Sequence, residues 1–163
     1  MNHRTRSYLF FLLLTGCICY LLSHYVVQLY FVSGPSMEPN FSSGQPVLLQ
    51  KFHLPEGLDY QDVIVIHRED LGRDIIKRIV ALPGDTVQII DGILYVNGTP
   101  ETVPTGLAPM EDAGNAASAL TLGTDEYFVL GDNRNRSIDS RFDEVGPIAA
   151  STIIGKVILP STH

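Results

Sequence analysis

The chain has 163 residues, of which 45% are hydrophobic and 18% are charged, and this length suits one domain of ordinary size. The charge is distributed unevenly. Residues 8–31 contain no Asp, Glu, Lys or Arg, whereas the part after residue 31 carries all 18 acidic residues and nine of the 11 basic ones. A nucleic-acid-binding protein needs a basic face for the phosphates, so this acidic balance argues against nucleic acid as a partner.

The uncharged segment 8–31 predicts a transmembrane anchor. Its 24 residues would extend roughly 36 Å as a helix, which is enough to cross the lipid bilayer. Arg4 and Arg6 precede it, so the positive-inside rule predicts a cytoplasmic tail at 1–7 and an extracytoplasmic domain at 32–163. A cleaved signal peptide fits less well, because the apolar character continues well past the usual length. We therefore expect a single-pass protein of the bacterial plasma (inner) membrane.

The predicted extracytoplasmic domain has the pattern of a mainly β fold. Short runs rich in β-branched and aromatic residues are separated by Gly, Pro, Asn and Asp, and Asp91-Gly92 is the strongest hairpin signal. Residues 104–123 are small and polar, and they predict a long loop or a small insertion. We expect a folded β-sheet or β-barrel. The predicted strands are 47–50, 62–67, 74–82, 86–90, 93–96, 126–130 and 152–158.

A serine lies in a stiff segment directly after the predicted anchor. The stretch S-G-P-S-M-E-P-N (33–40) holds two Ser, one Gly and two Pro. Pro35 fixes its own φ and restricts Gly34, so the backbone that approaches Ser36 has little freedom. Gly34 also allows a substrate chain to come close. By composition alone the stretch is equally typical of an ordinary turn.

A lysine lies in the middle of a predicted strand. In D-I-I-K-R-I-V-A-L-P-G-D (74–85), Lys77 shares one side of the strand with Ile75 and Ile79. Such a lysine either faces solvent at a sheet edge or is buried, and burial lowers the pKa of its amine. A neutral amine can act as the general base for a serine hydroxyl, as it does in Ser–Lys dyads.

A third segment gathers polar residues after an apolar strand. G-D-N-R-N-R-S-I-D-S-R places Ser137, Asp139, Ser140 and Arg141 close together. It predicts either a turn rich in local hydrogen bonds with an Asp139–Arg141 pair, or a clamp that shapes a site and supplies a hydroxyl to the base.

Together these segments resemble the type I signal peptidases, serine proteases that remove signal peptides from exported proteins. The resemblance rests on S-G-P-S-M-E-P, D-V-I-V-I, K-R-I-V-A-L-P-G-D and G-D-N-R-N-R-S-I-D-S-R, in this order and behind a predicted anchor. It covers residues 8–158. It implies a β-rich fold that rests on the membrane, and signal-peptide-bearing preproteins as substrates.

The resemblance also implies roles for individual residues. Ser36 matches the nucleophile, Lys77 the general base, and Ser137 a serine that hydrogen-bonds the lysine amine. Asp139 and Arg141 match a structural pair, with Arg78 nearby.

Further residues are expected to form the oxyanion hole and the substrate pocket. Gly34 stands where some members carry a serine donor, which leaves the backbone N–H of Ser36 to hold the oxyanion and a second donor unassigned. Met37 matches a residue that packs near the dyad. An extended substrate would add a strand beside the serine loop, and shallow apolar walls would favour the small-x-small cleavage pattern. The expected walls are Met37, Ile75 and Ile76, with Phe41 as a further candidate.

Other functions fit fewer of these residues. A Ser-His-Asp hydrolase would need His53 or His67, and neither lies in a recognisable motif. A specialised peptidase for one client, of the conjugation or pilus type, remains open. So does a non-catalytic anchored β-domain that binds exported peptides. We expect no metal ion and no cofactor.

Overall fold

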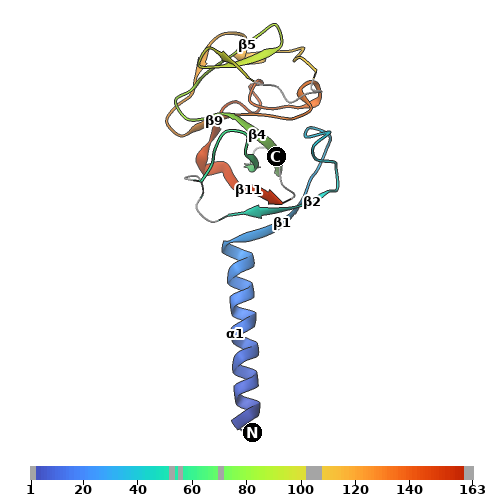
Figure 1. Ribbon diagram of the computed structural model, residues 1–163, viewed down its shortest axis with the longest axis vertical. Coiled ribbons are helices and arrows are strands. Elements are labelled where there is room, and N and C mark those ends of the chain that lie inside the picture. The colour runs from blue at the N-terminus through green and yellow to red at the C-terminus, as the bar shows by residue number, and fades with distance from the viewer. Residues whose placement is uncertain (1–2, 52–53, 55–56, 70–71, 102–107, 160–163) are drawn as a thin grey trace.

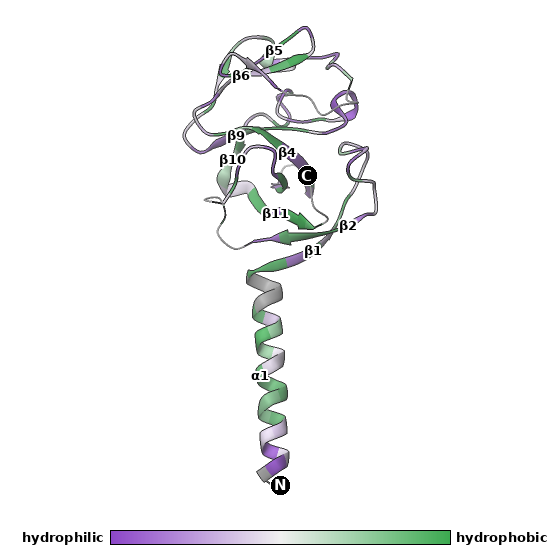
Figure 2. Ribbon diagram, viewed as in Figure 1, coloured by the Kyte–Doolittle hydropathy of each residue, from purple (hydrophilic) through white to green (hydrophobic). Residues whose placement is uncertain are grey.

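The computed structural model describes residues 3–51, 54, 57–69, 72–101 and 108–159. The N-terminal helix α1 (His3–Tyr25) extends away from a β-rich body that contains the other elements (Figure 1). Hydrophobic residues occupy the middle of α1 and the strands of the body, whereas the first turn of α1 is hydrophilic (Figure 2). Within the described ranges, no helix combines the length and the apolar character that crossing a membrane requires.

The uncharged segment 8–31 contains more than one element. Helix α1 ends at Tyr25, and Val27–Phe31 forms strand β1, which pairs antiparallel with β2 (Pro46–Gln50). The predicted anchor boundary at residue 31 therefore lies beyond the helix. A lack of charge is shared by apolar helices and by strands rich in Val, Leu, Tyr and Phe, so charge alone could not place the transition.

Seven strands form one antiparallel sheet in the order β1-β2-β11-β3-β4-β9-β10. A second sheet has the order β7-β6-β5-β8. Among the described strands neither sheet closes on itself, so the fold is a folded open sheet and the barrel alternative is wrong. The remaining bounds are β3 (Val63–Arg68), β4 (Arg73–Ala81), β5 (Thr86–Ile90), β6 (Ile93–Val96), β7 (Thr99–Pro100), β8 (Leu120–Thr121), β9 (Glu126–Leu130), β10 (Ile148–Ala149) and β11 (Ile153–Leu159).

All seven predicted strands are confirmed to within one residue at each end. Asp91 and Gly92 join β5 to β6 with φ values of 51° and 77°, the left-handed conformations that a tight hairpin requires. The predicted loop 104–123 is only partly a loop. Residues 104–107 lie outside the described residues, and β8, farther along it, pairs with β5.

Strand β4 runs through the centre of the large sheet and becomes progressively buried. Its first residues are exposed or half-buried, whereas the stretch from Ile76 to Ala81 is buried. One face packs with Val63 and Val65 of β3, and the other with Ile64 and Ile66. Because both faces are covered, a polar side chain in this stretch is withdrawn from water.

Candidate active site

Ser36 and Lys77 meet at the start of this buried stretch. Lys77 Nζ lies 2.9 Å from Ser36 Oγ and also donates a hydrogen bond to the carbonyl of Ile76 at 3.0 Å. A contact from the segment after β9 holds the Ser36 loop in place, because the backbone N–H of Asn133 donates to the Ser36 carbonyl at 3.0 Å. The structure therefore brings the predicted hydroxyl and amine into direct contact, although they lie 41 residues apart in sequence.

Burial controls the ionisation of Lys77. The residue is 3% exposed, and its pKa falls from the ordinary 10.5 to about 8, mainly because burial penalises the ammonium form. The positive charge of Arg73 lowers this pKa further, whereas the carboxylates of Asp139 and Asp132 act in the opposite direction. A substantial share of the amine is therefore neutral close to physiological pH.

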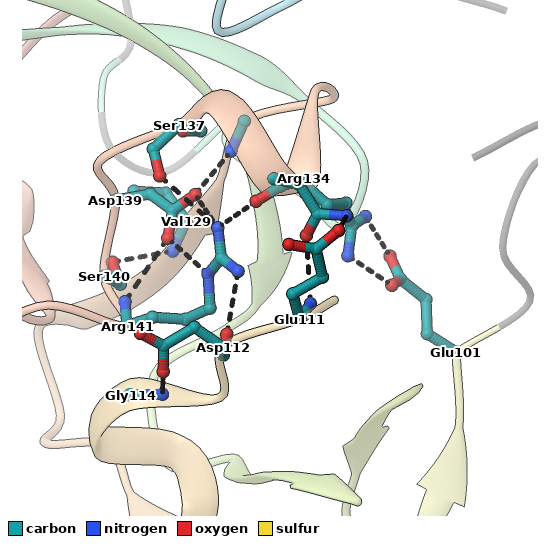
Figure 3. Close-up of polar contacts among 12 residues, drawn as sticks. Glu101, Glu111, Asp112, Gly114, Val129, Arg134, Ser137, Asp139, Ser140 and Arg141 are labelled. Atoms are coloured by element: carbon teal, nitrogen blue, oxygen red, sulfur yellow. Dashed lines mark hydrogen bonds and ion pairs between the residues drawn. The ribbon is translucent and has the colours of Figure 1, made fainter. Parts of the chain in front are cut away.

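Asp139 is held by Arg141 in a buried pair with two hydrogen bonds (Figure 3). Arg141 Nε lies 2.8 Å from Asp139 Oδ1, and Arg141 Nη2 lies 3.0 Å from Oδ2. Asp139 Oδ2 also accepts the backbone N–H of Gly131 at 3.1 Å, and Arg141 Nη1 donates to the carbonyl of Asp112. The pair ties the end of β9 to the polar segment that follows it.

A second buried pair joins Arg78 to Asp132. Arg78 Nε and Nη2 lie 2.7 and 2.6 Å from the two carboxylate oxygens of Asp132, and Asn40 Nδ2 donates to the same carboxylate at 2.8 Å. This cluster links β4, the residues after β9 and the serine loop. Asp132 was not among the residues predicted from the sequence, although it follows an apolar strand in the G-D-N motif.

A third pair, Arg134–Glu101, was also missed. Arg134 Nη1 lies 3.0 Å from Glu101 Oε2, and both residues are buried (Figure 3). Its partners lie 33 residues apart in the sequence, and although Arg134 stands in the G-D-N-R-N-R-S-I-D-S-R segment, Glu101 stands in no recognisable motif.

The hydrogen bond expected between Ser137 and Lys77 is not formed. Ser137 is buried, and its Oγ has no hydrogen-bond partner among the residues described. The side chain lies instead against Gly131. A Cβ added at Gly131 would stand 2.3 Å from Ser137 Oγ and 2.5 Å from the Ser36 carbonyl oxygen. Ser137 is thus adjacent to the nucleophile loop, but Lys77 donates its hydrogen bonds to Ser36 Oγ and the Ile76 carbonyl.

An open cleft of about 350 Å³ contains the dyad. Ile75 and Ile76 line it, as predicted, and so does Gly34, which has a φ of 85°. Met37 and Phe41 do not: they are 0% and 2% exposed and pack in the core beneath Ile76. The remaining lining residues, most of them missed by the sequence analysis, are Tyr30, Ser33, Pro35, Arg73, Asp74 and Ile138.

The Ser-His-Asp alternative finds no support among the described residues, and His53 lies outside them. Ser36 Oγ contacts a lysine rather than a histidine, and His67 Nδ1 lies 2.7 Å from Asp74 Oδ1. Throughout the described ranges, no group of three or more His, Cys, Asp or Glu residues could hold a metal ion.

Comparison with known proteins gives one consistent result. The sequence profile of the family described as "Signal peptidase, peptidase S26" matches residues 5–162. Signal peptidase I T of Bacillus subtilis (strain 168) is 33% identical over 144 residues, which cover 83% of this chain and 74% of that protein. Signal peptidase IB of Staphylococcus aureus is 31% identical over 156 residues, which cover 86% and 80%. A crystal structure of a signal peptidase I from Enterococcus faecalis V583 matches with 30% identity and a TM-score of 0.47, covering 62% of this chain and 96% of that one.

The family profile and the relatives identify a serine peptidase. The chain belongs to the signal peptidase family, peptidase S26.

Gly131→Ala is expected to damage the site more than the fold. The added methyl would push Ser137 and the Ser36 carbonyl apart, and a displacement of about 1 Å at the nucleophile can cost roughly a hundredfold in rate. We expect peptidase kcat/KM to fall by about that factor, and the free energy of unfolding by about 1–3 kcal/mol.

Gly123→Ala is the matched control, because a Cβ there would meet only the flexible Glu126 side chain, at 3.1 Å and beyond. Activity measured beside urea unfolding separates the two effects. Wild-type kcat/KM in Gly131→Ala would contradict the close packing described here.

Proposed function

We propose that this protein removes N-terminal signal peptides from exported preproteins at small-x-small sites, with Ser36 as the nucleophile and Lys77 as the general base. The observation that carries the proposal is the 2.9 Å contact between Lys77 Nζ and Ser36 Oγ, in surroundings that hold the Lys77 pKa at about 8. The substrate class is taken from the relatives, which are signal peptidases I.

Acylation would begin with the neutral amine. Lys77 accepts the Ser36 hydroxyl proton while Oγ forms a bond to the scissile carbonyl carbon, and the carbonyl oxygen becomes an oxyanion. The resulting ammonium donates its proton to the leaving nitrogen as the C–N bond breaks. The mature protein leaves with a free amine, and the signal peptide remains as an ester on Ser36.

In deacylation, water would replace Ser36 as the nucleophile, and Ser36 would become the leaving group. Lys77, neutral again, takes a proton from a water molecule that attacks the ester carbon, and the Ser36 oxygen recovers the proton as it departs. In both steps the backbone N–H of Ser36 is proposed to hold the oxyanion. The left-handed conformation of Gly34, with no side chain, allows the substrate backbone to come close to the loop.

An extended substrate would bind along β4. One edge of β4 pairs with β3 from Arg73 to Arg78, whereas pairing with β9 starts only at Arg78. Among the described strands, the other edge of residues 73–77 is therefore open for a further strand. Ile75 and Ile76 line the cleft here, and shallow apolar walls suit small side chains beside the cut.

Removing either member of the dyad is expected to abolish cleavage. Ser36→Ala and Lys77→Met should each lower kcat/KM on a preprotein at least about a thousandfold without unfolding the domain. Lys51→Met, a lysine outside the cleft, is the matched control and should retain wild-type activity.

The pH dependence follows from the lowered pKa of Lys77. The active form is the neutral amine, so kcat/KM should rise as the pH increases through about 8 and then level off. A rate that falls between pH 7 and 8.5, or a Lys77→Met variant that cleaves normally, would rule out Lys77 as the base.

We also propose that α1 anchors the domain to the plasma membrane, with the tail 1–7 in the cytoplasm and the β-domain outside, although the described part of α1 by itself falls short of the length and apolar character of a membrane-spanning helix. Large apolar side chains on α1 are exposed, among them Leu12 and Leu13 at 70% and 71%, and Arg4 and Arg6 precede them. Leu29 and Phe31 on the adjoining β1 are also exposed and would rest on the lipid surface. The anchor would then share one surface with membrane-inserted substrates, which raises their effective concentration.

Membrane association can be tested by fractionation of cells that produce the full chain. We expect the protein to remain in the membrane pellet after an alkaline carbonate wash, and the double variant Leu12→Arg, Leu13→Arg to move largely to the supernatant, because each arginine makes insertion unfavourable. Thr5→Arg is the control. Equal recovery of the double variant and the wild type in the pellet would contradict anchoring by α1.

A further inference from the structure

Arg73 places an unpaired positive charge at the outer end of the cleft. Arg73 lines the cleft and is exposed, and its guanidinium makes no hydrogen bond or ion pair with any described residue. The neighbouring acid, Asp74, also lines the cleft, and its Oδ1 lies 2.7 Å from His67 Nδ1. Arg68 lies across from Arg73 in the strand register, and its guanidinium donates to the Glu144 carbonyl.

Arg73 lies on the same face of β4 as the dyad lysine. Side chains alternate along a strand, so Lys77, Ile75 and Arg73 point to one side. Electrostatics agrees, because the charge of Arg73 is one of the causes that lower the Lys77 pKa. Four steps along the strand separate Arg73 from Lys77, which corresponds to about 13 Å.

An extended substrate has the same repeat as the strand it joins. For a substrate that runs parallel to β4 with the residue before the cut beside Lys77, the third residue before the cut lies beside Ile75 and the fifth beside Arg73. The second and fourth residues point to the other side.

We propose that Arg73 forms a cationic subsite that favours an acidic side chain at the fifth residue before the cleavage site and disfavours a lysine or arginine there. A guanidinium offers paired N–H donors to a carboxylate, and it repels another cation. The subsite is exposed to water, so its selectivity is modest. This inference rests on the proposed function and adds a charge preference to a cleft whose other walls select by size.

The test uses preprotein peptides that differ only in having Glu, Gln or Lys at the fifth residue before the cut, with the same three side chains at the fourth residue as a register control. The enzymes are wild type, Arg73→Gln, Arg73→Glu and the control Lys51→Gln, which removes a positive charge outside the cleft. We expect wild type and Lys51→Gln to prefer Glu over Lys at the fifth residue on the order of fivefold in kcat/KM. Arg73→Gln should bring this ratio close to one, and Arg73→Glu should invert it.

An unchanged Glu/Lys ratio in both Arg73 variants, or an equal preference at the fourth residue, would overturn the subsite. Binding of the same peptides to Ser36→Ala and to Ser36→Ala, Arg73→Glu, measured by fluorescence anisotropy, separates the two claims. Charge-dependent binding without cleavage by the wild type would contradict the proposed function alone. Cleavage that depends on Ser36 and Lys77 but ignores Arg73 would contradict the subsite alone.

Discussion

The Lys77 amine is withdrawn from water in the centre of a sheet whose two faces are both covered. An ammonium ion in such a position loses most of its hydration, and only nearby acceptors or negative charges can compensate. The acceptors on the amine are the hydroxyl of Ser36 and a single backbone carbonyl. The proposed chemistry of the cleft depends on this incomplete compensation for the lost hydration, because a fully charged lysine could not take a proton.

Two carboxylates near Lys77 would stabilise its ammonium form if their charges were not neutralised. Asp139 and Asp132 both raise the pKa of Lys77. Each is committed to an arginine, Arg141 and Arg78, through two hydrogen bonds, so much of its negative charge is neutralised locally. The two ion pairs thus hold the loops in place. They also allow acidic residues to lie close to the Lys77 amine without keeping it protonated. Removing one arginine would leave a buried carboxylate uncompensated, which is costly in itself.

Most of the β architecture was predictable from sequence, because strand patterns are local. The seven predicted strands and the turn at Asp91-Gly92 depend on neighbouring residues only. The meeting of Ser36 and Lys77 was predicted through the order of the family motifs. Strand β1 was not, since no charged residue separates its apolar residues from those of the helix.

Contacts between distant segments were the least predictable features. The Arg78–Asp132 and Arg134–Glu101 pairs join positions 54 and 33 residues apart, and no spacing rule links them. Met37 and Phe41 look like pocket walls in sequence because apolar residues serve both as walls and as core. Ser137 is near the nucleophile loop, yet the direction of one hydroxyl depends on packing against Gly131.

The most direct test is to measure the ionisation of Lys77 in the folded protein. With lysine side chains labelled with carbon-13 at the ε position, the Lys77 signal can be assigned by its absence in Lys77→Met and followed by NMR from pH 6 to 11. A titration midpoint close to 8 is expected. A midpoint at the ordinary value of 10.5 would contradict the account, because the amine would then carry its proton at every pH where the enzyme works.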